Sequence, residues 1–173
     1  YGKVEPNNIK VLAGFSQKIN IYPSDDNVIQ DVLVNGESIG AKDEFIIDSV
    51  SEDISIEVIY KVKQYDINAL AHGNGKISNE GVTKVKYGES QTYTFTPFED
   101  SKIDKVLVDG NEIGAVNTYT FSDVHDNHDI EVIFKKIKYT VSFNGMGADV
   151  SPASVKCEIM KPFGDALPVP SMA

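Results

Sequence analysis

Residues 91–97, which decide the fold, are Gln91-Thr92-Tyr93-Thr94-Phe95-Thr96-Pro97. Aromatic residues alternate with threonines here, and an apolar residue at every second position is typical of a strand with one buried face. Tyr119 and Phe121 continue the same period of two in a second stretch. Aromatic and β-branched residues favour strands, and no ten-residue stretch shows a convincing helical period. The sequence therefore predicts an all-β protein with these alternating aromatic residues in its core.

The stretch has a counterpart 74 residues earlier in the chain. A shift of 74 aligns residues 11–65 with residues 85–139 without a gap, and 21 of the 55 aligned residues are identical. The period is too long for one coil of a solenoid. We therefore predict tandem units: residues 1–64 form the first and lack its opening strand, residues 65–138 form the second, and residues 139–173 form a partial third.

Each unit is predicted to consist of short strands joined by turns. The Asx-Gly pairs Asn35-Gly36 and Asp109-Gly110 predict hairpin turns, because these residues tolerate the positive φ that a tight turn needs. Short antiparallel strands of this kind predict a small β-sandwich, immunoglobulin-like in the broad sense. The first unit is expected to repeat all but the first of the strands predicted for the second, near residues 65–71, 75–79, 82–86, 90–97, 102–108, 118–122 and 129–137.

Composition excludes several partners. The net charge is −10, from 26 acidic and 16 basic residues, and an acidic chain is repelled by nucleic acid and by anionic lipid. No apolar run approaches the roughly 18 residues that span a bilayer. Cys157 is the single cysteine, so no internal disulfide is possible. We expect a monomeric segment that neither binds nucleic acid nor inserts into a membrane.

The histidines of the second unit suggest one metal site, which the repeat argues against. His125, Asp126 and His128 have the donor types and the short spacing that zinc or calcium uses. The first unit has Ser51 and Ile54 at the two histidine positions. A position that accepts isoleucine is half-buried, so the favoured interpretation is a turn in which His128 packs at the start of a strand. No metal is expected.

Two aromatic residues are candidates for a sugar-binding platform. Tyr87 and Phe98 do not belong to the alternating pattern and are therefore the better candidates for exposure. Isolated exposed aromatic residues are common on protein surfaces, so ordinary packing is the favoured alternative. Any sugar site at these residues would belong to the second unit alone.

Catalysis is not expected. The two units share no Ser–His–Asp arrangement and no Cys–His pair with supporting residues. Gly73-Asn74-Gly75 does not open a helix, so it does not form the anion site that a glycine-rich loop makes at a helix N-terminus. We predict a protein without catalytic residues or a cofactor.

The ordered pattern of the second unit resembles the divergent internalin B-repeat. The residues that carry the resemblance are Ala71-His72-Gly73-Asn74-Gly75-Lys76-Ile77-Ser78, residues 85–97, Ile103-Asp104-Lys105-Val106-Leu107-Val108-Asp109-Gly110, Tyr119-Thr120-Phe121 and Asn127-His128-Asp129-Ile130. The first unit is a more degenerate copy. Residues 139–170 resemble the first half of a Listeria–Bacteroides repeat, which implies a β-grasp-like fold for the third segment.

The resemblance implies a setting for the chain. Such repeats form arrays in secreted and wall-attached bacterial proteins, and the family has no catalytic residues to carry over. We therefore expect an extracellular, wall-attached or secreted segment that acts as a stalk or spacer, or as an adhesive module for a host or cell-wall glycan or protein. The alternative is a carbohydrate-binding accessory module of an extracellular glycan-degrading enzyme.

Overall fold

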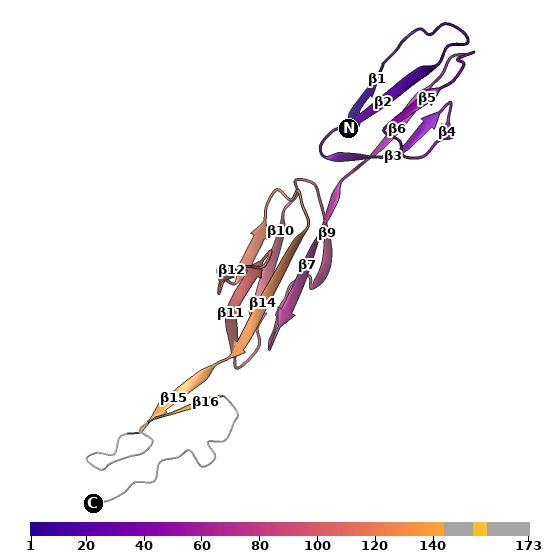
Figure 1. The fold of residues 1–173 in the computed structure, drawn as a ribbon. Helices are drawn as coiled ribbons and strands as arrows, with labels where there is room; N and C mark the ends of the chain where they lie inside the picture. The colour runs from indigo at the N-terminus through magenta and orange to yellow at the C-terminus, as the bar shows by residue number, and fades with distance from the viewer. Residues whose placement is uncertain (144–153, 159–173) are drawn as a thin grey trace, which may run out of the picture. The chain divides into compact units, whose positions relative to one another are not determined.

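The computed structural model describes residues 1–143 and 154–158, and none of these residues lies in a helix. The protein is all-β, as the alternating pattern predicts (Figure 1). The strands that precede residue 64 are β1 (Gly2–Glu5), β2 (Gln17–Pro23), β3 (Asn27–Val34), β4 (Glu37–Ser38), β5 (Glu44–Ile47) and β6 (Ile56–Val62). We call these six strands the first copy.

The next strand, β7 (Gln64–His72), has no counterpart in the first copy. It is followed by β8 (Gly75–Ile77), β9 (Gly81–Lys86), β10 (Gln91–Pro97), β11 (Ser101–Val108), β12 (Asn111–Gly114), β13 (Thr118–Phe121) and β14 (His128–Lys136). We call β8 to β14 the second copy. Every strand predicted for the second unit is present, within two residues at each end.

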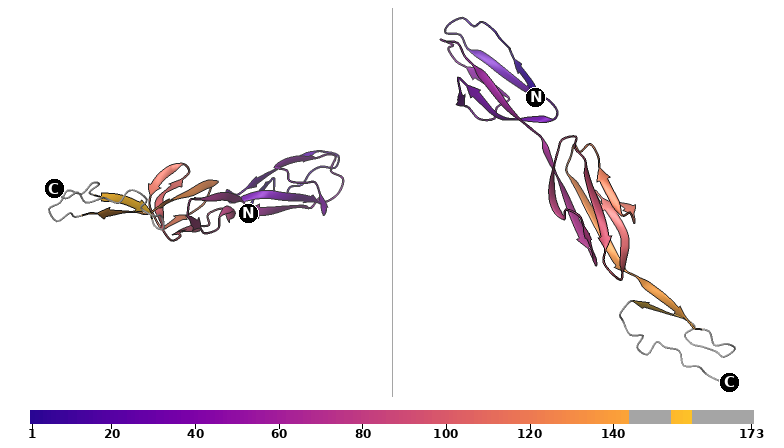
Figure 2. Two further views of the ribbon diagram at one scale, coloured as in Figure 1. Left: turned by 90° about the horizontal axis from the view of Figure 1, so that it is seen from below. Right: turned by 180° about the vertical axis from the view of Figure 1, so that it is seen from behind.

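Each copy contributes two sheets. In the first copy their strand orders are β1-β2-β5 and β4-β3-β6. The second copy has the equivalent order β13-β10-β8 in one sheet, and β7 joins the other to give β12-β11-β14-β7-β9. Figure 2 shows these sheets from two further directions. Small sheets of short strands agree with the predicted β-sandwich class.

The two copies share one strand register. Ile19 pairs with Phe45 between β2 and β5, and the residues 74 further on, Tyr93 and Tyr119, pair between β10 and β13. The larger sheets agree even in their irregularity, because the register shift between Ile29 and Asp31 recurs between Ile103 and Lys105. Hydrophobic patterning and turn geometry set register, and both are kept between the copies.

The hairpin turns after β3 and β11 are also alike. Both residues of each Asx-Gly pair have positive φ: 51° and 85° at Asn35 and Gly36, and 50° and 76° at Asp109 and Gly110. Each Asx side chain also accepts a backbone hydrogen bond: from the amide of Ser55, just before β6, at 2.8 Å in the first copy, and from the amide of Asp129, in β14, at 2.9 Å in the second. The residue pairs predicted to form turns do form them.

The cores are built at equivalent positions but differ in extent. The first copy buries three apolar residues, Ile19, Ile21 and Val32, and their equivalents Tyr93, Phe95 and Val106 are buried in the second. The second copy with β7 adds ten more, which are Ile67, Ala69, Ile77, Val85, Val108, Phe121, Val124, Ile130, Val132 and Phe134. The first copy is therefore the less enclosed of the two.

Two sequence predictions need correction. The strands were predicted to be antiparallel, but β7 runs parallel to β14, with Ile67 beside His128 and His72 beside Ile133. The first unit was also predicted to repeat the strand at 82–86, but the equivalent residues 8–12 form no strand. In the second copy β9 lies next to β7, and the first copy has no strand that corresponds to β7.

The third predicted unit lies mostly outside the described residues. Its described part is the antiparallel pair β15 (Lys138–Ser142) and β16 (Ser154–Glu158), in which Tyr139 faces Cys157. By Cα proximity the chain divides into two compact units, of which the first comprises Tyr1–Tyr65, Lys84–Ser90 and Ser122–Asp126, and the second comprises Asp66–Thr83, Gln91–Phe121 and Asn127 onward.

Candidate functional site

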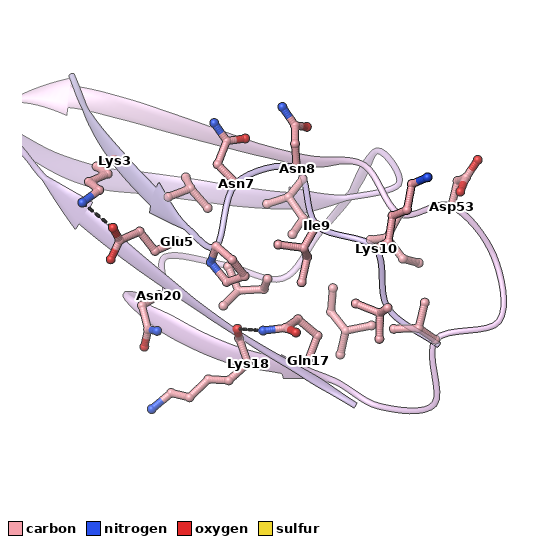
Figure 3. Close-up of a pocket in the computed structure, with 18 of the residues that line it drawn as sticks. Lys3, Glu5, Asn7, Asn8, Ile9, Lys10, Gln17, Lys18, Asn20 and Asp53 are labelled. Atoms are coloured by element: carbon pink, nitrogen blue, oxygen red, sulfur yellow. Dashed lines mark hydrogen bonds and ion pairs between the residues drawn. The ribbon is translucent and has the colours of Figure 1, made fainter. Parts of the chain in front are cut away.

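A groove lies in the first copy. It has a volume of about 1500 Å³ and lies between β1, β2 and the loop that follows β1, with the start of β6 and residues 50–54 at its other border. In Figure 3 the side chain of Ile9 points into this groove, whereas those of Asn7 and Asn8 point away from it. We call this feature the groove.

The rim of the groove is polar. Lys3 forms an ion pair with Glu5, and Lys18 forms one with Glu44 at 2.6 Å. The hydrogen bond from each lysine to its carboxylate raises the pKa of the ammonium group above its ordinary value. Gln17 Nε2 donates to the carbonyl oxygen of Lys18 at 2.7 Å (Figure 3). Lys3 and Lys18 are thus each paired with a carboxylate at the rim.

Apolar side chains form part of the lining of the groove. Its lining includes Val4, Val11, Ile47, Val50 and Ile56, all of which are half-buried. No His–carboxylate or cysteine cluster lies among the lining residues.

Sequence reasoning missed this groove. The lining residues are ordinary strand and loop residues, and their pattern is that of a core. The lining comes from segments as far apart as residues 2–11 and 47–56, so no local signal in the sequence identifies the groove.

His125 is held by a local contact. Its Nε2 atom lies 2.9 Å from Asp123 Oδ1, and its ring stacks on Tyr87 with 4.2 Å between centroids. Asp126 is exposed in the same turn. One ring nitrogen and one ring face of His125 are therefore in contact with neighbouring residues. Asp123, in the same turn, has a positive φ of 55°.

His128 has different partners. It lies at the start of β14 and is half-buried. Its Nδ1 atom lies 2.8 Å from Asp109 Oδ2, and its ring stacks on Phe121 with 4.7 Å between centroids. Among the residues that the structure describes, no group of three or more histidine, cysteine, aspartate or glutamate residues is placed to hold a metal ion.

The two candidate aromatic residues are differently placed. Tyr87 is half-buried, with His125 stacked on its ring and Tyr65 tilted against it at 6.4 Å between centroids. Phe98 is 48% exposed in the turn between β10 and β11. Stacking a sugar needs a free ring face, and Tyr87 has one face covered by His125. The first copy has Ala13 and Ser24 at the two positions.

The described part of the chain contains no helix that is long and apolar enough to cross a membrane. Comparison of the chain with models of known protein families and with curated proteins gave no match.

Proposed function

We propose that this chain is a non-catalytic repeat segment of a bacterial cell-surface or secreted protein, and that it serves as a stalk that carries tension along the polypeptide. The cell-surface or secreted location rests on the sequence resemblance to the internalin B-repeat. The mechanical role rests on one observation, the parallel pairing of β7 with β14.

The parallel pair lies directly in the path of a stretching force. The chain enters the second copy through β7 at Gln64 and leaves it through β14 at Lys136. Because the two strands are parallel, these residues lie at opposite ends of the paired segment. A load along the chain therefore shears all the paired residues of the two strands, from Ile67–His128 to His72–Ile133, at the same time. It does not separate the pairs one after another. The resistance of a fold to force is set by its unfolding barrier, and breaking many bonds at once raises that barrier.

The surroundings of the pair support this role. Four residues of the pair are 0% exposed: Ile67, Ala69, Ile130 and Val132. Water therefore has little access to the hydrogen bonds between the two strands. Hydrogen bonds in such surroundings are electrostatically stronger than in water and open less often. The exit of β14 is fixed as well, because the amide of Ile137 donates to the carbonyl of Asp100 at 2.7 Å.

The duplication points the same way. Just after β6, the backbone amide of Lys63 donates a hydrogen bond to the carbonyl oxygen of Asp26 at 2.9 Å. The backbone amide of Ile137 does the same to Asp100 in the second copy. By contrast, the histidine pair of the second copy is replaced by Ser51 and Ile54. The backbone hydrogen bond at the end of the last strand is kept, and chemically distinctive side chains vary, which suits a structural repeat better than a catalytic one.

Single-molecule stretching with two attachment geometries tests the proposal. Cys157→Ser removes the native thiol, and Gln64→Cys with Lys136→Cys supplies handles at opposite ends of the parallel pair. Gln64→Cys with Asp126→Cys supplies the matched control, in which both handles lie at the same end and the pairs separate one after another. All three handle positions are exposed. We expect a several-fold higher unfolding force in the first geometry. Equal forces in the two geometries would contradict a tension-bearing role.

A further inference from the structure

We propose that the outer face of the larger sheet of the second copy is a self-association surface, at which two molecules of this chain pack face to face about a two-fold axis near Ile133. The outer face is the side of β11, β14, β7 and β9 whose residues alternate along each strand with buried ones, which are Ile67, Ala69, Val85, Val106, Ile130 and Val132. The association is weak, with a Kd of about 100 μM, as a small contact gives. The chain is therefore monomeric when dilute and pairs where it is crowded.

Four neighbouring strands each place an apolar side chain on the outer face. β11, β14, β7 and β9 are neighbours in the sheet, and they contribute Leu107, Ile133, Leu70 and Val82, which we call the apolar stripe. Leu70 is 37% exposed and Val82 is 64% exposed. Glu131 pairs with Leu107 on one side and with Leu70 on the other, so Ile133, two residues further along β14, is a diagonal neighbour of both leucines. Adjoining exposed apolar residues of this kind mark an interaction surface.

The two copies agree on the outer side of one sheet and differ on that of the other. In the larger sheet, four outward residues recur unchanged 74 residues later: Leu33, Glu57, Ile59 and Lys61 have the counterparts Leu107, Glu131, Ile133 and Lys135. Outward positions at the register shift, such as Asp31 and Lys105, do differ. In the smaller sheet, the five outward residues of β2 and β5 all differ from their counterparts in β10 and β13, which are all threonine. Outward residues contribute little to a core, so retention on one outer face alone indicates binding and not folding.

The charges of the outer face suit contact with a second identical face. The chain has a net charge of −10, and two strongly acidic surfaces repel each other. On the outer face, however, opposite charges lie together: Lys105 Nζ is 3.4 Å from Glu112 Oε2, and Lys135 is paired with Asp104. A face of mixed sign meets its own equivalent without placing blocks of like charge against each other.

The order of residues along β14 gives the contact its two-fold symmetry. Glu131 and Lys135 lie two residues to either side of Ile133, which places each charge about 7 Å from Ile133 along the strand. A two-fold axis at Ile133 therefore sets Glu131 of each molecule opposite Lys135 of the other, with the two Ile133 side chains in contact. Such a contact is isologous, because one patch is complementary to itself. The apolar stripe supplies the affinity, and the two symmetric ion pairs select the register.

Sedimentation equilibrium of the 173-residue chain at neutral pH tests the proposal. We expect the weight-average mass to rise between about 10 μM and about 1 mM, where roughly four fifths of the chains are paired if the Kd is about 100 μM. A weight-average mass that stays at the monomer value over this range would overturn the proposal.

Charge reversal distinguishes the two-fold contact from other forms of self-association. Glu131→Lys alone and Lys135→Glu alone each place like charges opposite each other twice, so each variant should pair about tenfold more weakly than the wild type. In an equimolar mixture of the two variants, opposite charges meet at both sites, so pairing between the variants should return at least to the wild-type strength. A mixture that pairs no better than its components would exclude the two-fold axis at Ile133.

Val82→Gln tests the apolar stripe, and Thr94→Gln and Thr94→Lys on the outer side of the smaller sheet are the matched controls. Val82 and Thr94 are both exposed, so none of these changes should alter the Tm. We expect Val82→Gln to weaken pairing about threefold and both Thr94 variants to leave it unchanged. Equal weakening by the Val82 and Thr94 variants, or none by Val82→Gln, would place the contact elsewhere on the molecule and contradict the proposal.

Discussion

His128 and Asp109 join the start of β14 to the hairpin turn that ends β11. The Nδ1 atom of His128 lies 2.8 Å from Asp109 Oδ2, while Asp109 Oδ1 accepts a hydrogen bond from the Asp129 amide at 2.9 Å. The first copy keeps only the second of these contacts, with Asn35 as the acceptor for the Ser55 amide. The turn is therefore fixed by a backbone hydrogen bond in both copies and by a histidine only in the second.

The Asp109–His128 pair should make the second copy sensitive to acid. Burial alone would raise the pKa of Asp109, but the hydrogen bonds from the Asp129 amide and from His128 lower it below its ordinary value of 3.8. A folded-state pKa below the unfolded one means that the stabilisation is complete above about pH 3.8 and is lost as the pH falls through the lowered value. Asp109→Asn should be less stable than the wild type at pH 7 by under about 1 kcal/mol, because the pair is partly exposed.

Chemical denaturation at pH 7 and in the acid range below the ordinary Asp pKa measures this difference. The gap between wild type and Asp109→Asn should close in acid. Asp109→Ala is the comparison variant: it also loses the acceptor for Asp129 and places alanine at a φ of 50°, so its free energy of unfolding should fall by about a further 1–2 kcal/mol. Equal losses for the two variants would refute the assigned role of Oδ1.

Tyr93 should tolerate the loss of its hydroxyl but not of its ring. The side chain is 0% exposed, and its hydroxyl has no hydrogen-bond partner among the described residues. Tyr93→Phe should leave the free energy of unfolding unchanged or raise it by about 1 kcal/mol, because an unsatisfied buried hydroxyl is removed. Tyr93→Ala should lower it by about 3–5 kcal/mol. Thermal and chemical denaturation would show the order, and a marked loss for Tyr93→Phe would mean that the hydroxyl is bonded.

Gly75 should resist substitution because of Phe134. A Cβ atom at Gly75 would lie 2.6 Å from the Phe134 ring. Gly2 pairs with Pro23 as Gly75 pairs with Pro97, and a Cβ atom there would lie 2.7 Å from the Tyr60 ring. Gly75→Ala should lower the free energy of unfolding by about 1–3 kcal/mol through overpacking. In a Phe134→Leu background the same substitution should cost less, and a double-mutant cycle measures the coupling. Strict additivity of the two changes would exclude the steric explanation.

Much of this fold could be predicted from the sequence, and particular residues show why the rest could not. The alternation in residues 91–97 indicates a strand with Tyr93 and Phe95 inward, and both are buried. The parallel pairing of β7 could not be predicted, because side chains alternate with a period of two in parallel and antiparallel strands alike. β12 was not predicted because Asn111–Gly114 lacks apolar alternation and forms a strand only as the second arm of its hairpin.

The sites show the same limits. The alignment of His128 with Ile54 predicts a packing position, and the structure places the ring half-buried against Phe121. Nothing local in the sequence identifies Asp109 as the partner of His128, because the contact joins residues 19 apart across a strand pair. The groove is lined by residues 2–11, 17–20 and 47–56, so it could be recognised only once the arrangement of these segments was known.

Zinc should not stabilise the chain. His125 Nε2 is engaged by Asp123 at 2.9 Å, and His128 Nδ1 by Asp109 at 2.8 Å. Zinc prefers four ligands in a tetrahedral arrangement, and the candidate residues do not supply such a set. Calorimetry with equimolar zinc should give no binding heat and leave the Tm unchanged. Binding heat that disappears in His128→Gln but persists in His72→Gln would establish a site at these residues instead.

The central claim is that the two copies share one strand register, and nuclear Overhauser contacts in the isotopically labelled 173-residue chain test it most directly. We expect contacts between Val32 and Val58 in the first copy and between Val106 and Val132, 74 residues further on, in the second. Contacts in the first copy displaced by one or more residues from those in the second would contradict the claim.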